Sequence, residues 1–426
     1  MKLFVFAGAG ASVELGVPAM RLMATELLEH LEATSSGDSF VASLRTRLDD
    51  TGGDLEQLIE DIDRICGADQ VLPAFGHKVA PDLSESARLT RSEIEWFVQH
   101  SCERVRAEGA ATLWAPLLHD VGDIELTIAT TNYDRSIELA AQRYGVKISD
   151  GFGAFGQREW STWSGFTQEG VRLLKLHGST DWYQVVDTPQ VAKLRHPMPL
   201  FGGVTLQVAA DELGALGSAL VLPSREKRTN SPPFPQISHE MFATSRAADA
   251  AVFVGTSLRD VDVQSLAAEC AARVPTLIVG PGMAHGQGIP PEAAIVDSMA
   301  AEFLISTLPR MLSEGAWPEP KSVVRFGDGE GHQDSILHEV NTLLDAGAAD
   351  QTKCIAIESL WKRSVSLGTR EIRPLLGVGS GALARDALAL VDLSRDRAEL
   401  LDTCEQLAAD TTDASFARDL ALLKQG

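Results

Sequence analysis

A glycine-rich turn directly follows the first apolar run of the chain. Leu3–Ala7 has the character of a short buried strand, and it is followed without a spacer by Gly8, Ala9, Gly10, Ala11 and Ser12. At the carboxyl end of a parallel strand such a turn can bind a pyrophosphate, because glycine lets the backbone approach the anion. The N–H groups of the turn and of the next helix then hold it. The spacing departs from the full Gly-x-Gly-x-x-Gly pattern, so a plain tight turn is the alternative for this segment alone.

Three further apolar runs also end in glycine or polar residues. The runs Leu126–Ala129, Val171–Leu176 and Ala251–Val254 have the character of strands. The residues that follow them and are suited to chemistry or binding are Asn132, Asp134, His177, Gly255, Thr256 and Ser257. Ligands of open α/β sheets lie outside the carboxyl ends of the strands. We therefore expect these residues to converge on whatever the first glycine turn binds.

Taken in order, these segments resemble the motifs of the sirtuin-like superfamily. The resemblance rests on Gly-Ala-Gly-Ala-Ser at 8–12 with Gly-Val-Pro at 16–18, Thr-Asn-Tyr-Asp at 131–134, Leu-His-Gly-Ser at 176–179, and Gly-Thr-Ser at 255–257. It covers about residues 1–310. It implies that the first turn cradles the pyrophosphate of NAD+, while Asn132 and Asp134 face the nicotinamide riboside. His177 would be the base near the ribose hydroxyls, and Thr256 and Ser257 would line the other end of the dinucleotide.

Two departures from the family pattern refine what the resemblance implies. Protein-deacylating sirtuins carry a zinc module with two Cys-x-x-Cys pairs, whereas the cysteines here are far apart, at Cys66, Cys102, Cys270, Cys354 and Cys404. A tetrahedral thiolate site needs ligands at short spacing, so we expect no structural metal. The Gly-Val-Pro element continues as Ala19-Met20-Arg21 and lacks the family's Asp-Phe pair. Both departures resemble the zinc-less branch of prokaryotic sirtuin-like proteins that hydrolyse NAD+ in antiphage defence.

The chemistry that the resemblance implies requires few groups. Cleavage of the bond between nicotinamide and ribose passes through an oxocarbenium-like state with a neutral leaving group, so no strong acid is needed. Asn132 would position a water or hydroxyl, His177 would accept a proton, and Asp134 would hold the carboxamide. The structural alternative for each is a turn or capping residue. We expect Tyr133 and Trp182 to pack rather than to react.

Composition and charge exclude several classes of protein. The chain has 426 residues, 44% hydrophobic and 23% charged, as in an ordinary globular protein. Its net charge of −22 argues against direct binding to nucleic acid. No apolar stretch approaches the roughly 20 residues of a membrane span, and the opening run is short for a signal peptide. Unpaired, scattered cysteines suit a reducing compartment, so we expect a cytoplasmic protein with no contact to membranes.

The elements that must position these residues form an α/β fold. Apolar spacing predicts a helix over 18–34 and a mostly helical segment from 35 to 119. We predict a Rossmann-like parallel sheet with an inserted helical module and a C-terminal helical region. The NAD-binding domain would span 1–315, with the insertion at about 35–119, and the helical region would span 333–426. Thr276–Val279 is expected to be the last strand. The aromatic, glycine-rich segment 150–165 is either a mobile lid or a loop pinned by its aromatics.

Three functions fit the sequence. The first is an NAD+ glycohydrolase with NAD+ as substrate and no metal. The second is a protein deacylase or ADP-ribosyl transferase, and the third is a non-catalytic sensor of NAD+ or ADP-ribose. An unrestrained NAD+ hydrolase would poison its host, so we expect a homo-oligomer and a possible controlling partner, such as an ATPase or nucleic-acid sensor encoded nearby. The apolar faces of the helices at 35–119 and beyond 333 would contact other subunits or, alternatively, the chain's own sheet.

Overall fold

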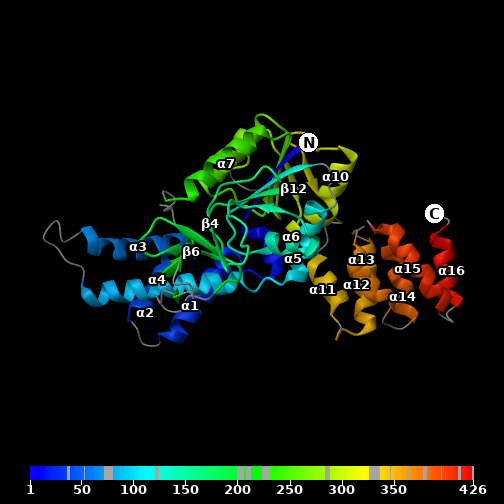
Figure 1. Cartoon of the computed structure of the whole chain (residues 1–426), viewed down its shortest axis with the longest axis horizontal. Coiled ribbons are helices and arrows are strands. Elements are labelled where there is room, and N and C mark those ends of the chain that lie inside the picture. Colours follow the sequence, from blue (N-terminus) through cyan, green and yellow to red (C-terminus); the bar gives the residue numbers. More distant parts are fainter. Residues whose placement is uncertain are drawn as a thin grey trace.

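An eight-stranded parallel sheet lies at the centre of the computed structural model (Figure 1). The structure describes residues 1–35, 39–51, 53–71, 80–119, 124–198, 206–207, 213–222, 231–283, 288–325, 336–345, 347–362, 365, 367–377, 381–394, 396–410 and 414–424. The strand order is β13-β12-β11-β10-β1-β2-β5-β3. The strands are β1 (Lys2–Ala7), β2 (Glu125–Thr130), β3 (Ile148–Ser149), β5 (Val171–Lys175), β10 (Ala250–Val254), β11 (Thr276–Val279), β12 (Ala294–Asp297) and β13 (Val323–Arg325). The predicted α/β fold class is confirmed, including the inserted helices and the helical C-terminal region.

The register of the central strands aligns their carboxyl ends in one row. Ala7 of β1 pairs with Val254 of β10 on one side and with Thr130 of β2 on the other. The same row continues to Lys175 of β5 and to Val279 of β11. From β1 the chain builds the sheet first toward β2 and β5, and later in the opposite direction from β10. The topological switch point, where α/β sheets bind ligands, therefore lies between β1 and β10.

Helices cover both faces of this sheet, which explains why its strands are apolar throughout. Successive side chains of β1 alternate between the faces. Leu3 and Val5 pack with α5 (Ala107–Leu118) and α6 (Ser136–Tyr144). Phe4 and Phe6 pack with α7 (Phe234–Ala247) and α8 (Val261–Ala271) on the other face.

The inserted helices form a separate hydrophobic cluster. This helical module consists of α1 (Met20–Thr34), α2 (Ser39–Asp50), α3 (Leu55–Val71) and α4 (Pro81–Cys102). Leu27, Ile59 and Ile94 are fully buried at its centre. The predicted helix at 18–34 is confirmed as α1. Packing places α1 with the module, whereas most of the apolar side chains of α5 pack on the sheet.

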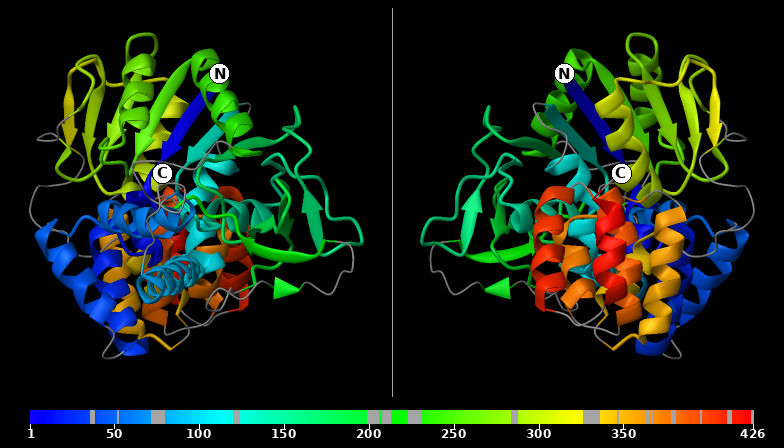
Figure 2. Two further views of the ribbon diagram at one scale, coloured as in Figure 1. Left: turned by 90° about the vertical axis from the view of Figure 1, so that its left-hand side faces the viewer. Right: turned by 90° about the vertical axis from the view of Figure 1, so that its right-hand side faces the viewer.

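A second, antiparallel sheet was not predicted from the sequence. Its order is β4-β7-β6-β9-β8, and its strands are β4 (Trp160–Thr162), β6 (Trp182–Val185), β7 (Val191–Leu194), β8 (Leu206–Gln207) and β9 (Ala215–Ser218). It stands at one side of the parallel sheet (Figure 2). The prediction that Thr276–Val279 is the last strand was also wrong, because β12 and β13 extend the sheet beyond it. These strands have two to four residues, too few for a clear apolar period.

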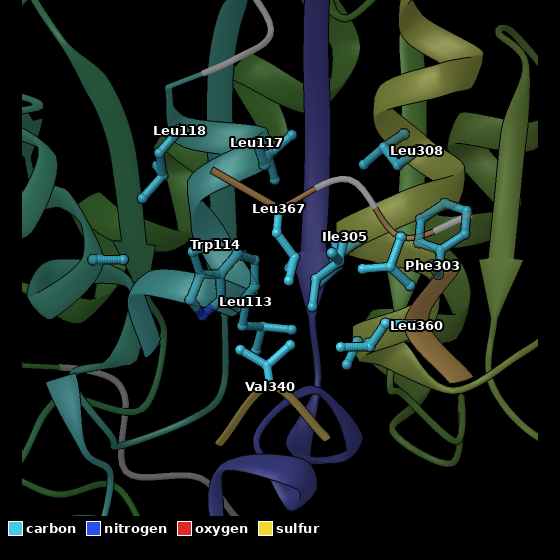
Figure 3. Packing of buried hydrophobic residues seen from close by; sticks show 14 of the residues in the cluster. Leu113, Trp114, Leu117, Leu118, Phe303, Ile305, Leu308, Val340, Leu360 and Leu367 are labelled. Atoms are coloured by element: carbon cyan, nitrogen blue, oxygen red, sulfur yellow. The ribbon is translucent and has the colours of Figure 1, made fainter. Parts of the chain in front are cut away.

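The C-terminal region consists of helices that share a core with the sheet. They are α11 (Ile336–Leu344), α12 (Asp350–Lys362), α13 (Thr369–Gly377), α14 (Gly381–Leu393), α15 (Arg397–Asp410) and α16 (Ala414–Leu423). Val340, Leu360 and Leu367 meet Trp114 of α5 and Ile305 of a π-helical segment, Phe303–Thr307, that leads into α10 (Leu308–Glu314) (Figure 3).

The apolar faces of these helices are thus buried within the chain. Their buried side chains lie in the same core as the sheet, which favours the alternative that we derived from the sequence. Contact with other subunits stays a prediction. The helical module and the C-terminal helices lie at opposite ends of the long axis (Figure 1). None of the helices in the described part of the chain is long and apolar enough to cross a lipid bilayer.

Candidate nucleotide-binding site

The predicted site residues follow one row of the parallel sheet. Asn132 and His177 each lie two positions beyond the paired residues Thr130 and Lys175. Gly8 and Gly255 each lie one position beyond the paired residues Ala7 and Val254. Since the strands are parallel, offsets of one or two positions from one row bring these residues to the same edge of the sheet. The structure therefore places the four predicted strand ends side by side, in the order β10, β1, β2, β5.

The glycines of the two central turns allow their backbones to pack directly against each other. The N–H of Gly10 donates to the carbonyl of Gly255 at 2.8 Å. A Cβ atom on Gly8 would lie 2.7 Å from the Gly255 oxygen, and one on Gly255 would lie 2.2 Å from the Ala11 nitrogen. Gly255 also has φ +66°, which favours glycine. Glycine is thus required here because two strand ends pack against each other. The sequence analysis had explained the same glycines by the close approach of a phosphate.

Most amides of the first turn are already bonded within the protein. Gly8 N–H donates to Val254 O at 2.9 Å, Ala11 N–H to Gly8 O at 3.0 Å, and Ser12 N–H to Ala9 O at 3.1 Å. With Gly10 also bonded to Gly255, only the exposed Ala9 has a turn amide without an acceptor among the described residues. Two 3₁₀ turns, Ala9–Ala11 and Val13–Leu15, follow, and α1 begins only at Met20. This differs from the expectation that the turn and the next helix offer several free N–H groups to an anion.

Asn132, Ser12 and Asp134 form a hydrogen-bonded chain. The side-chain nitrogen of Asn132 donates to Gly8 O and to Ser12 Oγ, both at 2.9 Å. Ser12 Oγ donates to Asp134 Oδ2 at 2.7 Å, and the amide of Ser136 donates to Asp134 Oδ1 at 2.9 Å. Asp134 is only 3% exposed, whereas Asn132 is half-buried. The first turn and the β2 end are therefore joined through side chains as well as through the sheet.

His177 is buried and lies beside the helical module. Its ring centroid is 6.3 Å from that of Tyr133, and its carbonyl accepts from the amide of Val221 at 2.9 Å. Tyr133 belongs to the core of the module, donates its hydroxyl to Val221 O at 2.7 Å, and has its pKa raised by burial. As expected, Tyr133 and the fully buried Trp182 are packing residues. Thus Tyr133 connects the module to the loop that carries His177.

Charged residues beneath the site were not found from the sequence. Lys175 is buried at the end of β5, and its Nζ donates to the carbonyl of Asp134 and lies 3.3 Å from Glu138 Oε1. Asp181, with no exposed surface, pairs with Arg135 at 3.1 Å and with Lys193 at 3.8 Å. Two contacts thus join the loops that carry Asn132 and His177: Lys175 with the Asp134 carbonyl, and Arg135 with Asp181. The one signal in the sequence was a lysine inside the apolar run Val171–Leu176.

Thr256 and Ser257 lie at the end of β10. Ser257 is exposed and Thr256 is half-buried, with its Oγ1 accepting from the amide of Leu258 at 3.3 Å. On the neighbouring strand end, the amide of Gly282 donates to Asp297 Oδ1 at 2.8 Å. Ser257 is therefore accessible at the far side of the switch point from Asn132 and His177.

The aromatic segment after β3 is fixed by its own rings. The Trp163 ring meets those of Phe152 and Phe166 edge-on at 5.5 and 5.2 Å, and Phe152 lies 4.7 Å from Trp182. Phe152 and Trp163 also form an isolated antiparallel bridge. Of the two interpretations of this segment, the packing favours the pinned loop.

The described residues contain no cluster of three or more potential metal ligands. All five cysteines are free thiols, and burial raises the pKa of Cys270 and of Cys404 to about 11. The side chain of Arg21 lies outside the described part of the structure.

Comparison with known proteins gives one family match. Residues 126–285 match the model of the SIR2-like domain. The match includes Asn132, His177 and Gly255 and supports the sirtuin-like superfamily. No curated protein shows significant similarity.

Solved structures also align with the chain. A Sir2 homologue in complex with NAD shares 14% identity over 74% of this chain and 90% of the other, with a TM-score of 0.42. A mutant Sir2 homologue with 2′-O-acetyl ADP ribose shares 14% identity over 74% of this chain and 92% of the other, at 0.41. A Sir2 structure with a p53 peptide and NAD+ shares 16% identity over 74% of this chain and 92% of the other, with a TM-score of 0.35.

Proposed function

We propose that this chain is an NAD+ glycohydrolase that cleaves NAD+ to nicotinamide and ADP-ribose. The observation that carries the proposal is that Asn132 and His177 follow two adjacent parallel strands, β2 and β5, each two positions beyond the paired residues Thr130 and Lys175. Both residues lie within the segment that matches the SIR2-like domain, which supports NAD+ as the substrate. The amide of Ala9 and the hydroxyl of Ser257, two exposed residues at the same edge, would contact the phosphates and the far ribose.

In the proposed reaction the bond between C1′ of the ribose and the nicotinamide nitrogen breaks. The bonding electron pair leaves with the nicotinamide ring, which becomes neutral, and the ribosyl group becomes an oxocarbenium-like cation. Water attacks C1′ and its proton passes to His177, whose imidazole is suited to accept a proton near neutral pH. Asn132 Oδ1 accepts a hydrogen bond from the attacking water and holds it in place. No metal takes part in this scheme.

A hydrolase is favoured over a protein deacylase by the segment between His177 and Gly255. In place of two close cysteine pairs, this segment contains strands β6 to β9 of the antiparallel sheet, whose core includes Tyr183, Val185 and Leu216. Cys270 is the nearest cysteine to this segment on its C-terminal side and is buried in α8. We accordingly propose that no zinc is needed for folding or activity.

The test is hydrolysis by two site variants. His177→Ala and Asn132→Ala should each lower the rate of NAD+ loss by about a hundredfold or more, the usual scale for a positioned acid–base group. The matched control is His239→Ala, because His239 is exposed on α7. Circular dichroism and thermal unfolding establish that each variant is folded. Wild-type activity in a folded His177→Ala protein would contradict the mechanism.

We further propose that the enzyme acts in the cytoplasm as an antiphage effector held in check by assembly. Free hydrolysis of NAD+ would deplete the host's own pool, so we expect a homo-oligomer of low basal activity with a controlling partner such as an ATPase or a nucleic-acid sensor. The net charge of −22 assigns any sensing of nucleic acid to that partner. Light scattering at micromolar concentration together with NAD+ loss tests this. A monomer that hydrolyses NAD+ at full rate alone would contradict it.

A further inference from the structure

The side-chain amide of Asn132 has its two hydrogens committed within the protein. Its nitrogen lies 2.9 Å from Gly8 O and 2.9 Å from Ser12 Oγ. A backbone carbonyl can only accept, so the atom facing Gly8 must be the nitrogen. Ser12 has one hydroxyl hydrogen and donates it to the Asp134 carboxylate at 2.7 Å, so toward Asn132 it can only accept. The one polar side-chain atom of Asn132 left for a ligand is therefore Oδ1.

We propose that Asp134 is a positioning residue that acts through Ser12 and, together with the Gly8 carbonyl, fixes the polarity of Asn132. The inference rests on the proposed function, because the ligand that Asn132 orients is the water that attacks C1′. Asp134 is 3% exposed, and its two oxygens accept from Ser12 Oγ and from the Ser136 amide. It is thus already engaged by the protein, unlike a group that holds the nicotinamide carboxamide, the role that the family resemblance implies.

The fixed polarity selects what Asn132 can bind. A carbonyl oxygen accepts from the O–H of a water or of a ribose hydroxyl and repels another carbonyl oxygen. Asp134 and the Gly8 carbonyl therefore ensure together that Asn132 meets the nucleophile as an acceptor. If the Ser12 hydroxyl hydrogen were free to point toward Asn132, Ser12 could donate to the amide oxygen in place of accepting from the amide nitrogen. The orientation of the Asn132 amide would then be weaker.

The sequence offers a direct spectroscopic test, since it contains three asparagines, at positions 132, 230 and 341. Protein labelled with ¹⁵N-asparagine shows three side-chain NH₂ groups, and the Asn132→Ala variant identifies the signal of Asn132. In the wild type this group should exchange slowly with water because both hydrogens are bonded. Ser12→Ala removes one acceptor, and exchange should become at least tenfold faster. Ser245→Ala is the control, because Ser245 is a buried serine in α7 whose hydroxyl donates only to Phe242 O at 3.1 Å.

Asp134→Asn tests the carboxylate itself. The substituted amide keeps one oxygen for the Ser136 N–H but turns a donor toward Ser12, which reverses the direction of the chain. Hydrogen exchange at the Asn132 amide should again become about tenfold faster. The variant has a fourth asparagine, whose NH₂ signal is identified in the double variant Asp134→Asn with Asn132→Ala. In kinetics, kcat should fall at least tenfold while KM for NAD+ stays within about twofold. Ser12→Ala combined with Asp134→Asn should be no worse than the poorer single variant, because the two act as one unit.

A substrate analogue separates this role from direct contact with the carboxamide. Nicotinic acid adenine dinucleotide carries a carboxylate where NAD+ has the carboxamide. Under the proposal Asp134→Asn lowers kcat/KM equally for both substrates, so their ratio stays at the wild-type value. A shift of that ratio by tenfold toward the analogue, or unchanged exchange at Asn132 in both variants, overturns the proposal. Faster exchange in variants of a protein that never hydrolyses NAD+ supports the positioning role and rejects the glycohydrolase function.

Discussion

Asp181 shows how single charged residues support the two loops of the site. It is fully buried, and burial works to raise its pKa, but the charges of Lys193, Arg135 and Lys175 outweigh burial and hold the pKa below the ordinary value. The Lys193 pKa, in turn, is raised, because the nearby Asp181 and Asp150 outweigh its burial. Each charge is therefore tolerated in the interior only because the others are present.

We predict that Asp181→Asn destabilises the fold by about 3–5 kcal/mol at pH 7, since it leaves buried cations with one partner fewer. The pKa of Asp181 is lower in the folded state than the roughly 3.9 of an unfolded aspartate. Its contribution to stability is thus fully present above about pH 4 and lost as the pH falls through the folded value. Urea unfolding from pH 3 to pH 7 should show a weaker acid dependence in the variant.

Asp187→Asn is the matched control for this experiment, because Asp187 is exposed in the same antiparallel sheet region. It should change the free energy of unfolding by less than about 0.5 kcal/mol. Equal stability of Asp181→Asn and wild type at pH 7 would show that the buried cluster does not hold the loops.

At the scale of elements, the contact between the ends of β1 and β10 depends on missing side chains. Gly255 has φ +66°, and a Cβ atom added to it would lie 2.2 Å from the Ala11 nitrogen. Gly145, the C-cap of α6, has φ +65°, and a Cβ atom added to it would meet nothing within 4 Å. The two glycines share a backbone conformation and differ in the space around them. Together they separate the cost of conformation from the cost of a steric clash.

Gly145→Ala should lower the free energy of unfolding by about 1–2 kcal/mol, the cost of a left-handed conformation for an L-residue. Gly255→Ala should lower the free energy of unfolding by at least about 2 kcal/mol more, because the backbone of Gly10 and Ala11 must move away from the new methyl group. The variant should also lose binding of NAD+, measured by calorimetry. Equal losses of stability in the two variants would mean that the strand ends are not held as closely as described.

The sequence predicted the elements that have a clear period and missed those that do not. The helix at 18–34 appears as α1, since its apolar residues repeat over four turns. The β8 strand has two residues and β13 has three, so neither leaves a pattern in the sequence. Asn132 and His177 were predicted because they follow apolar strands. Asp181 and Lys193 were missed, because only the tertiary fold brings them together.

At the scale of the whole molecule, one hydrophobic cluster joins the sheet to the C-terminal helices. Leu360 of α12 is fully buried in this cluster, which also contains Trp114 of α5 and Ile305 (Figure 3). Ile355, on the same helix, is 63% exposed. The C-terminal region is thus part of the structural unit that positions β1 and β2.

Leu360→Ala should lower the free energy of unfolding by about 2–5 kcal/mol, because it leaves a cavity in a shared core. Ile355→Ala should change it by less than about 0.5 kcal/mol. Differential scanning fluorimetry and urea unfolding measure both. If Leu360→Ala unfolds the C-terminal helices in a separate step while the sheet keeps its stability, the shared core is not one cooperative unit.

The central place of β1 in the sheet also determines when the chain can fold during synthesis. Leu3 pairs with Leu126 on one side and with Ala250 on the other, so β1 acquires its second neighbour only after about 250 further residues have been translated. At roughly 5–20 residues per second, β1 spends about 12–50 s without that neighbour. Through this interval an apolar strand edge is open to wrong partners, and pairing across such long loops is slow. The yield of folded protein should therefore depend on chaperones and on the rate of translation more than its equilibrium stability would indicate.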